Sequence, residues 1–148
     1  MNVVFLRGLN TFGDEQFRLG PWSLGRIDKF WRAKLIQSGH AFYAMDGMGP
    51  GDVSMQTHRA ATAFRQLRLQ KPGHRFHFLG YSQGGLVARA LVHEPDIASH
   101  VLSVTTLGTP HLGSRLAEKL GRFHTDHPIA HQVLRHFGYD TQIRSDGG

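Results

Sequence analysis

The sequence predicts an α/β fold, in which a central parallel sheet lies between two layers of helices as a three-layer sandwich. One observation is that short apolar segments alternate along the chain with longer segments of helical periodicity. Another is that glycine and proline stand at the junctions, as at Pro72-Gly73. Because consecutive parallel strands need a crossover that is usually a helix, this alternation favours a sheet covered on both faces. We expect one domain over residues 1–148.

The first half of the chain supplies two predicted strands and two predicted helices. Asn2–Leu6 is a continuous apolar run, as expected of a strand buried on both faces. Residues 22–36 are predicted as a helix that Gly39 ends, and residues 40–45 as a second strand. The helical spacing is carried by Leu24, Ile27, Phe30, Trp31 and Leu35. A second helix is expected from Ser54, as its cap, to about residue 70. One side of that helix is apolar and carries Ala60, Ala61, Phe64 and Leu67.

The second half continues the alternation. Alternating residues that end in Phe78-Leu79 predict a third strand, and the spacing of apolar residues after Leu86 predicts a third helix. Residues 100–107 are rich in β-branched side chains and predict a fourth strand. Ligands of parallel sheets bind at the carboxyl ends of the strands. We therefore expect the functional residues in the loops that follow the first, third and fourth strands.

Composition excludes several classes of protein. The chain carries a formal net charge of +6 and a pI near 10.3, yet no cluster of five basic residues occurs, so we expect a solvated basic surface and no nucleic-acid partner. The absence of cysteine excludes disulfides and cysteine nucleophiles. The sequence shows neither a transmembrane segment nor an export signal, which favours a cytoplasmic protein. No cofactor is expected, and no metal, because the 11 histidines are scattered and no H-E-x-x-H occurs.

The junction of the third strand and third helix carries the pattern G-x-S-x-G, as Gly80-Tyr81-Ser82-Gln83-Gly84. Between a strand and a helix this pattern is typical of a nucleophile elbow. The serine must occupy a tight, strained turn so that its hydroxyl projects from the sheet. The glycines are needed because a larger side chain would collide with the neighbouring strand and helix. The turn also directs backbone N–H groups at the helix start toward a bound oxyanion.

With this motif, the chain resembles a bacterial lipase or esterase of the α/β-hydrolase superfamily. The resemblance is carried by Gly80-Tyr-Ser-Gln-Gly-Gly85 and by T-L-G-T-P-H-L-G-S at residues 106–114, which is close to the lipase segment T-x-G-T-P-H-x-G-S. The opening strand with Gly8-Leu9 resembles the lipase strand that supplies half of the oxyanion hole. The family usually has His-Gly in that loop, where this chain has Arg7-Gly8. The resemblance covers roughly residues 1–115.

The resemblance implies roles for individual residues. Ser82 would be the nucleophile, and the N–H groups of Leu9 and Gln83 would bind the oxyanion. The superfamily order places an acid and then a histidine after the nucleophile. Asp140 is the first candidate for the acid, if residues 132–143 form a strand and a glycine turn. If residues 128–137 instead form a helix, Asp146 is the alternative acid.

The general base is the missing part of this constellation. No histidine follows Asp140 or Asp146, because the last one is His136. The chain is therefore expected to be a partial, C-terminally truncated α/β-hydrolase that lacks the last strands of the fold. The resemblance implies a structural or pocket-lining role for His111 rather than that of the general base. His111 is nevertheless the alternative base, because its loop borders the elbow and a triad is defined by geometry rather than by chain order.

The predicted function is hydrolysis of carboxylic esters through an acyl-serine intermediate, on a small-molecule or lipid ester. A catalytically silent hydrolase-fold protein with a binding role is the alternative, which the missing late histidine favours. Thioesterase and amidase activities stay open, since the fold does not select the acyl group. An exposed edge of the fourth strand predicts self-association.

Overall fold

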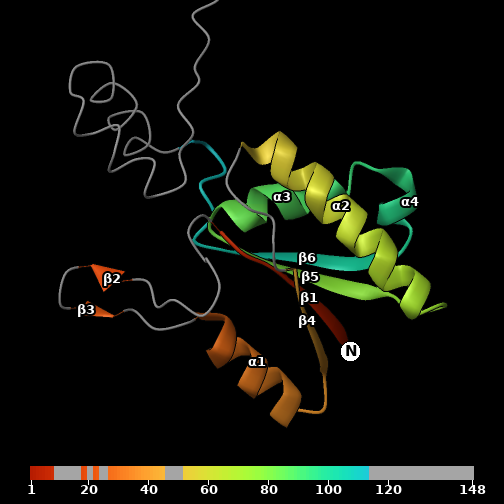
Figure 1. The fold of residues 1–148 in the computed structure, drawn as a ribbon, viewed down its shortest axis with the longest axis horizontal. Helices are drawn as coiled ribbons and strands as arrows, with labels where there is room; N and C mark the ends of the chain where they lie inside the picture. The colour runs from red at the N-terminus through yellow and green to blue at the C-terminus, as the bar shows by residue number, and fades with distance from the viewer. Residues whose placement is uncertain (9–17, 20–21, 24–26, 46–51, 114–148) are drawn as a thin grey trace, which may run out of the picture.

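The computed structural model describes residues 1–8, 18–19, 22–23, 27–45 and 52–113 (Figure 1). Within these residues a four-stranded sheet has the order β4-β1-β5-β6, and each pair of neighbours is parallel. The strands are β1 (Asn2–Leu6), β4 (Ala41–Met45), β5 (Phe76–Tyr81) and β6 (Val101–Leu107). These four strands are those predicted from the apolar segments, and their parallel arrangement is confirmed.

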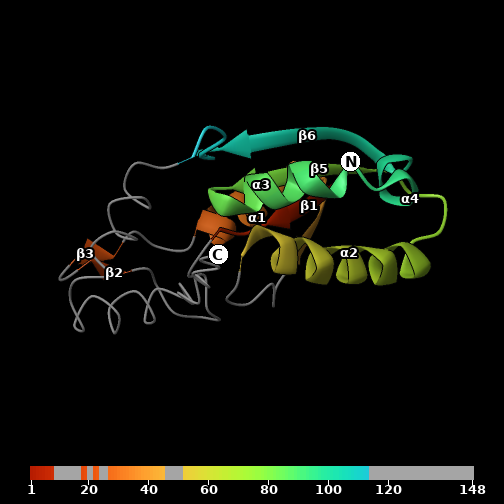
Figure 2. The same ribbon diagram turned by 90° about the horizontal axis from the view of Figure 1, so that it is seen from above.

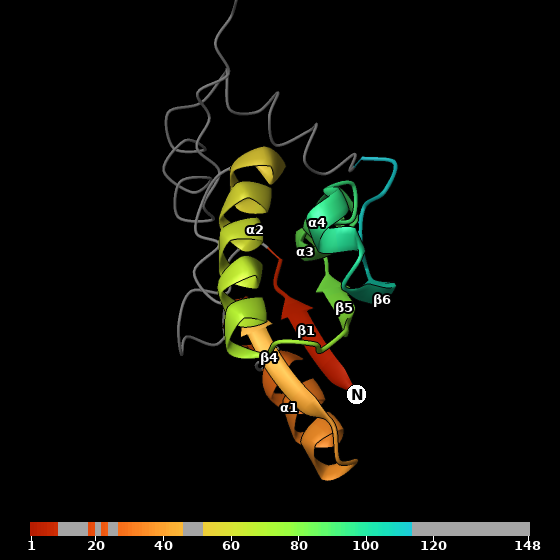
Figure 3. The same cartoon turned by 90° about the vertical axis from the view of Figure 1, so that its right-hand side faces the viewer.

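Helices cover both faces of the sheet. The helices α2 (Val53–Gln70), α3 (Gln83–Leu91) and α4 (Pro95–Ala98) lie over one face, and α1 (Ile27–Gln37) lies over the other (Figures 1 and 3). Seen from above, α2 and α3 lie over the sheet and β6 runs along its border (Figure 2). The predicted three-layer sandwich with a central parallel sheet is confirmed.

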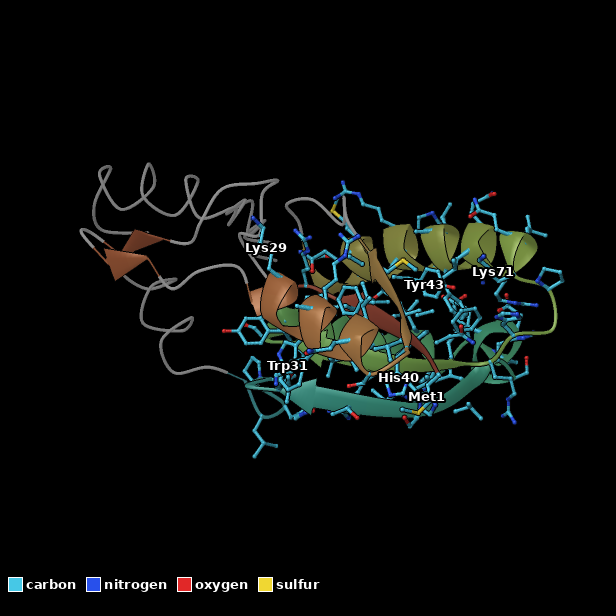
Figure 4. All side chains as sticks on the ribbon, turned by 90° about the horizontal axis from the view of Figure 1, so that it is seen from below. Met1, Lys29, Trp31, His40, Tyr43 and Lys71 are labelled. Carbon is cyan, nitrogen blue, oxygen red and sulfur yellow. The ribbon has the colours of Figure 1, made fainter. Side chains whose placement is uncertain are left out.

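The strand β1 lies between β4 and β5 and is the most deeply buried part of the sheet. From Val3 to Leu6 its side chains are at most 6 % exposed, which confirms the prediction of a strand covered on both faces. On the face of α1, Phe5 stacks on Phe42 with ring centroids 5.8 Å apart. At the amino end, the Ala41 N–H donates to the Met1 carbonyl at 2.9 Å, and the terminal amine of Met1 lies 3.5 Å from the His40 Nδ1 (Figure 4). These contacts anchor β1 to β4 at the end opposite the expected site.

Aromatic packing joins α2 to the sheet. Phe64 of α2 contacts Phe76 and Phe78 of β5 edge to face, with centroids 5.2 and 5.0 Å apart. All three rings are at most 1 % exposed. Ala60 and Ala61 are also buried, as the helical spacing predicted.

Two helix starts differ from the prediction. The helix α1 begins at Ile27 rather than at residue 22, because Trp22–Ser23 (β3) pairs in antiparallel fashion with Arg18–Leu19 (β2). Residues 22–23 therefore form a strand pair, although the spacing of the apolar residues was also compatible with a helical turn there. The cap of α2 is Asp52 rather than Ser54, and its Oδ1 accepts the Met55 N–H at 2.8 Å. A carboxylate is the better cap, since it satisfies an orphan N–H and also complements the helix dipole.

The end of α1 follows the prediction. Gly39 has φ +75°, a conformation that favours glycine. The Gly39 N–H donates to the Ile36 carbonyl and the His40 N–H to the Leu35 carbonyl, both at 2.9 Å. This pair of bonds is the Schellman motif, and it turns the chain directly into β4.

The short helix α4 was not predicted, and an ion-pair cluster holds it against α2. Arg65 of α2 donates to both carboxylate oxygens of Asp96, at 2.9 and 3.1 Å, and also contacts Glu94. The Arg68 guanidinium adds a bond to the Asp96 carbonyl at 2.8 Å. The hydrogen bond from Arg65 lowers the pKa of Asp96 below its ordinary value. Four residues are too short for a periodicity to be visible in the sequence.

Among the residues that the structure describes, no helix is both long enough and apolar enough to span a membrane.

The aromatic contact between α2 and β5 should dominate the stability of this core. We expect Phe64→Ala to lower the free energy of unfolding by about 3–5 kcal/mol, because it removes a buried ring and leaves a cavity beneath α2. Leu69→Ala on the same helix is the matched control. Leu69 is 75 % exposed, so its loss should change the free energy of unfolding by less than about 0.5 kcal/mol. Urea unfolding of the two variants measures the difference, and equal effects would contradict the assignment of the core.

The pairing of Asp96 with Arg65 should make stability depend on pH. Because the pKa of Asp96 is lowered in the folded state, the pairing stabilises the protein at neutral pH. This contribution is lost as the pH falls through the lowered pKa. We therefore expect Asp96→Asn to melt at a lower temperature than the wild type at pH 7, and the two to converge in acid. A difference in melting temperature that persists at every pH would show that the charge of Asp96 is not the cause.

Candidate active site

The topology brings two loops together at the carboxyl end of the sheet. From β1 the chain passes to β4 on one side, and the later strands β5 and β6 lie on the other side. The connections therefore diverge between β1 and β5, and the carboxyl ends of strands at such a point are where parallel sheets bind their ligands. The register aligns Leu6 with Gly80, so the residues that follow each strand, Gly8 and Ser82, become neighbours.

Ser82 occupies a strained turn between β5 and α3. Its φ is 53° and its ψ is −126°, and among the described residues it is the one non-glycine residue with positive φ. Such a conformation costs about 1–3 kcal/mol and persists only where its surroundings enforce it. Its N–H donates to the Leu107 carbonyl at 2.8 Å, and its carbonyl accepts the Gly85 N–H at 3.0 Å. The strained strand-to-helix turn expected from G-x-S-x-G is therefore present.

Glycines surround this turn because the backbones approach one another closely. A Cβ on Gly80 would lie 2.5 Å from the Gly85 Cα, and a Cβ on Gly84 would lie 2.2 Å from the Leu6 carbonyl oxygen. A Cβ on Gly8 would lie 2.7 Å from the Ser82 Cβ and 3.2 Å from its Oγ. Gly80 thus allows β5 to lie close to α3, and Gly84 allows α3 to lie close to the end of β1. Gly8 brings the loop after β1 to the serine itself.

The first turn of α3 supplies hydrogen-bond donors beside Ser82. Gln83 is its first residue, and the first N–H groups of a helix have no partner within the helix. These groups, together with the helix dipole, suit a negatively charged oxygen. Leu9, the other predicted donor, lies outside the described residues. Of the two residues before Leu9, Gly8 lies against Ser82, and Arg7 is buried, with 6 % of its surface exposed.

His111 lies in the turn after β6 and is held by two hydrogen bonds. Its Nδ1 is 2.8 Å from the Arg89 guanidinium of α3, and its Nε2 is 3.0 Å from the Thr106 Oγ1 of β6. Because arginine can only donate, Nδ1 accepts and Nε2 carries the proton. In this arrangement neither nitrogen offers a lone pair to the Ser82 hydroxyl.

Thr109 is a site residue that sequence reasoning did not single out. Its hydroxyl donates to the Ser82 carbonyl oxygen at 2.9 Å, across the border of β5 and β6. A Cβ on Gly85 would lie 2.0 Å from the Thr109 Oγ1, so the glycine makes room for this side chain. The T-P-H segment was the available signal. Its resemblance to lipases drew attention to the histidine, whereas the threonine contacts the elbow.

The acidic residues that follow Ser82 in the sequence do not contact it within the described residues. Asp140 and Asp146 lie outside the described residues, and their roles stay predictions. Glu94 and Asp96, the first acidic residues after Ser82 in the sequence, both contact Arg65. Among the described residues, no group of three or more histidine, aspartate or glutamate side chains could hold a metal ion.

The strain at Ser82 can be measured directly. We expect Ser82→Gly to be more stable than Ser82→Ala by about 1 kcal/mol, because glycine adopts φ 53° without the strain that any Cβ imposes. Both variants lose the hydroxyl, so the difference between their free energies of unfolding, measured by chemical denaturation, reports the backbone strain at residue 82. Equal stabilities would show that the turn is not strained.

Comparisons with known proteins agree with this geometry. Residues 36–145, more than half of the chain, match the family model described as palmitoyl protein thioesterase. The mature form of the Bacillus licheniformis lipase BlEst2 is similar in structure, with a TM-score of 0.62 and 20 % identity over 93 % of this chain. The propeptide form of the same lipase has a TM-score of 0.60 and 23 % identity over 79 % of this chain.

At these identities the two structures establish the fold, and they confirm the predicted α/β-hydrolase-like architecture. The chain spans 50 % of the length of the mature lipase and 24 % of the propeptide form. No curated protein matches the sequence.

Proposed function

Because the chain belongs to the palmitoyl protein thioesterase family, we propose that it hydrolyses carboxylic esters, thioesters included, through an acyl-serine intermediate. The observation that carries the proposal is the conformation of Ser82. A serine held at φ 53° between a strand and a helix, against a glycine-lined loop, costs free energy that a merely structural serine does not require. Such strain is typical of a serine whose hydroxyl must project toward a substrate.

The reaction assigns Ser82 as the nucleophile. Its Oγ attacks the carbonyl carbon and gives up its proton to a base, while the carbonyl π electrons move onto the oxygen. The N–H groups of Gln83 and Leu9 stabilise this oxyanion. The intermediate collapses and expels the alcohol or thiol, which takes the proton back from the base. Water then attacks the acyl-serine in the same way and releases the acid.

The base and its orienting acid stay predictions. His111 is the candidate base, and to accept the Ser82 proton its ring would have to leave Arg89 and Thr106. Asp140 is the candidate acid, with Asp146 as the alternative. The catalytically silent binding protein is the second candidate function, and the two hydrogen bonds of His111 favour it, because they leave the nucleophile without a base among the described residues.

Self-association through the edge of the fourth strand also stays a prediction. Within the described residues, β6 pairs with β5 on one side, and its Leu102 is 47 % exposed. The cytoplasmic location expected from the sequence is likewise a prediction.

Replacement of the proposed nucleophile tests the enzyme hypothesis. We expect Ser82→Ala to lower kcat on a p-nitrophenyl butyrate ester and on a butyryl thioester by at least about a thousandfold, because the acyl-serine cannot form. Ser103→Ala on β6 is the matched control, since the Ser103 hydroxyl contacts His77 on an exposed part of the strand. Its activity should equal that of the wild type.

A fluorophosphonate probe gives a second measurement that needs no knowledge of the substrate. Rapid labelling of the wild type, but not of Ser82→Ala, is expected from an activated serine. A wild type that neither hydrolyses the esters nor takes up the probe would overturn the proposal and favour the silent binding protein.

A further inference from the structure

We infer that Thr109 is a positioning residue that sets the orientation of the oxyanion-binding Gln83 N–H through the Ser82 carbonyl. The inference rests on the proposed function and extends it to a residue outside the triad and the oxyanion hole. The starting point is the 2.9 Å hydrogen bond from the Thr109 hydroxyl to the Ser82 carbonyl oxygen.

The Ser82 carbonyl and the Gln83 N–H belong to one peptide group. Because the peptide bond is planar and trans, the C=O and N–H point in opposite directions and rotate as one unit. A donor that holds the Ser82 oxygen therefore also restrains where the Gln83 N–H points. Two groups donate to this oxygen: the Gly85 N–H from within α3, at 3.0 Å, and the Thr109 hydroxyl from outside the helix. The Ser82 N–H is held separately by the Leu107 carbonyl at 2.8 Å. The two bonds, both to the segment that ends β6, restrain the backbone on either side of the serine Cα.

Gly85 shows that room is made for this contact. A Cβ at that position would lie 2.0 Å from the Thr109 Oγ1 and 2.8 Å from its Cγ2. Glycine inside a helix costs up to about 1 kcal/mol relative to alanine. The second glycine of Gly84-Gly85 is thus explained by the side chain that packs on it, whereas Gly84 is explained by the carbonyls of Leu6 and Arg7.

The turn that carries Thr109 is itself held in place. Gly108 before it has φ +57°, and the His111 N–H donates to the Thr109 carbonyl at 2.9 Å. The His111 ring then bridges Arg89 of α3 and Thr106 of β6. The bridge connects the turn to the same helix that begins at Gln83. In this arrangement the His111 ring supports the turn that carries Thr109.

The test is a pair of substitutions at Thr109. We expect Thr109→Val to lower kcat about tenfold, with KM within about twofold, because a misaligned donor loses part of the hundredfold or greater effect of a complete oxyanion donor. Thr109→Ser keeps the hydroxyl and should restore most of the rate. Thr57→Val is the matched control, since the part-buried Thr57 hydroxyl also donates to a backbone carbonyl, that of Val53, but within α2. Its kcat should be unchanged.

A second measurement keeps this inference separate from the proposed function. Amide hydrogen exchange of residues 82–85 should be faster in Thr109→Val than in the wild type and Thr109→Ser, whether or not the protein hydrolyses esters. If the wild type is inactive but exchange responds in this way, the proposed function fails and the restraint on the elbow stands. Unchanged exchange and unchanged kcat in Thr109→Val, or an equal loss of kcat in Thr109→Ser, would overturn the inference.

A substitution of His111 distinguishes a residue that supports Thr109 from a general base. If His111 supports Thr109, His111→Ala should lower kcat about tenfold, as Thr109→Val does. The double variant Thr109→Val with His111→Ala should then have the same kcat as either single variant. A loss as large as that of Ser82→Ala would instead identify His111 as the general base, and would overturn its assignment as a support.

Discussion

The structure depends on the close approach of three backbone segments at the carboxyl end of the sheet. The end of β1, the turn at Ser82 and the start of α3 meet at distances that leave no space for a Cβ at Gly80 or Gly84. A helix can begin directly after β5 only because these glycines allow it to lie against β1. This contact places the strained serine, the loop at Gly8 and the helix N–H groups within one small volume. Replacement of either glycine by a larger residue would push these backbone segments apart.

The packing of the core makes the sheet rigid, and a rigid sheet holds the turn at Ser82 in its strained conformation. The strand β1 is buried on both faces, and the packing of Phe64 on β5 joins the largest helix to the strand that carries the elbow. A conformational strain of a few kcal/mol can be held at Ser82 because the elements on either side cannot relax. Stability elsewhere in the domain is thus a condition of the geometry at the site.

Sequence patterns predicted the architecture well where one physical signal dominated. The buried run of β1, the apolar side of α2 and the glycine that ends α1 each follow from local periodicity or from backbone freedom. The failures have a common cause. The start of α1, the Asp52 cap and the helix α4 were decided by competition among partners, namely a strand pairing, a better capping group and an ion pair with Arg65. Periodicity contains no information on such partners.

The sequence by itself determined the alternation of the four parallel strands with α1, α2 and α3, because the apolar periodicity changes at each junction. It also determined the presence of a strained serine turn, because G-x-S-x-G places its glycines where backbones must touch. Only the tertiary structure decided what contacts that turn. Thr109 lies 27 residues from Ser82, and His111 lies 22 from Arg89, so their hydrogen bonds exist only because β6 pairs beside β5. The physical reason is that a motif specifies local backbone conformation, whereas the partner of a hydroxyl or an imidazole depends on strand register and on helix placement.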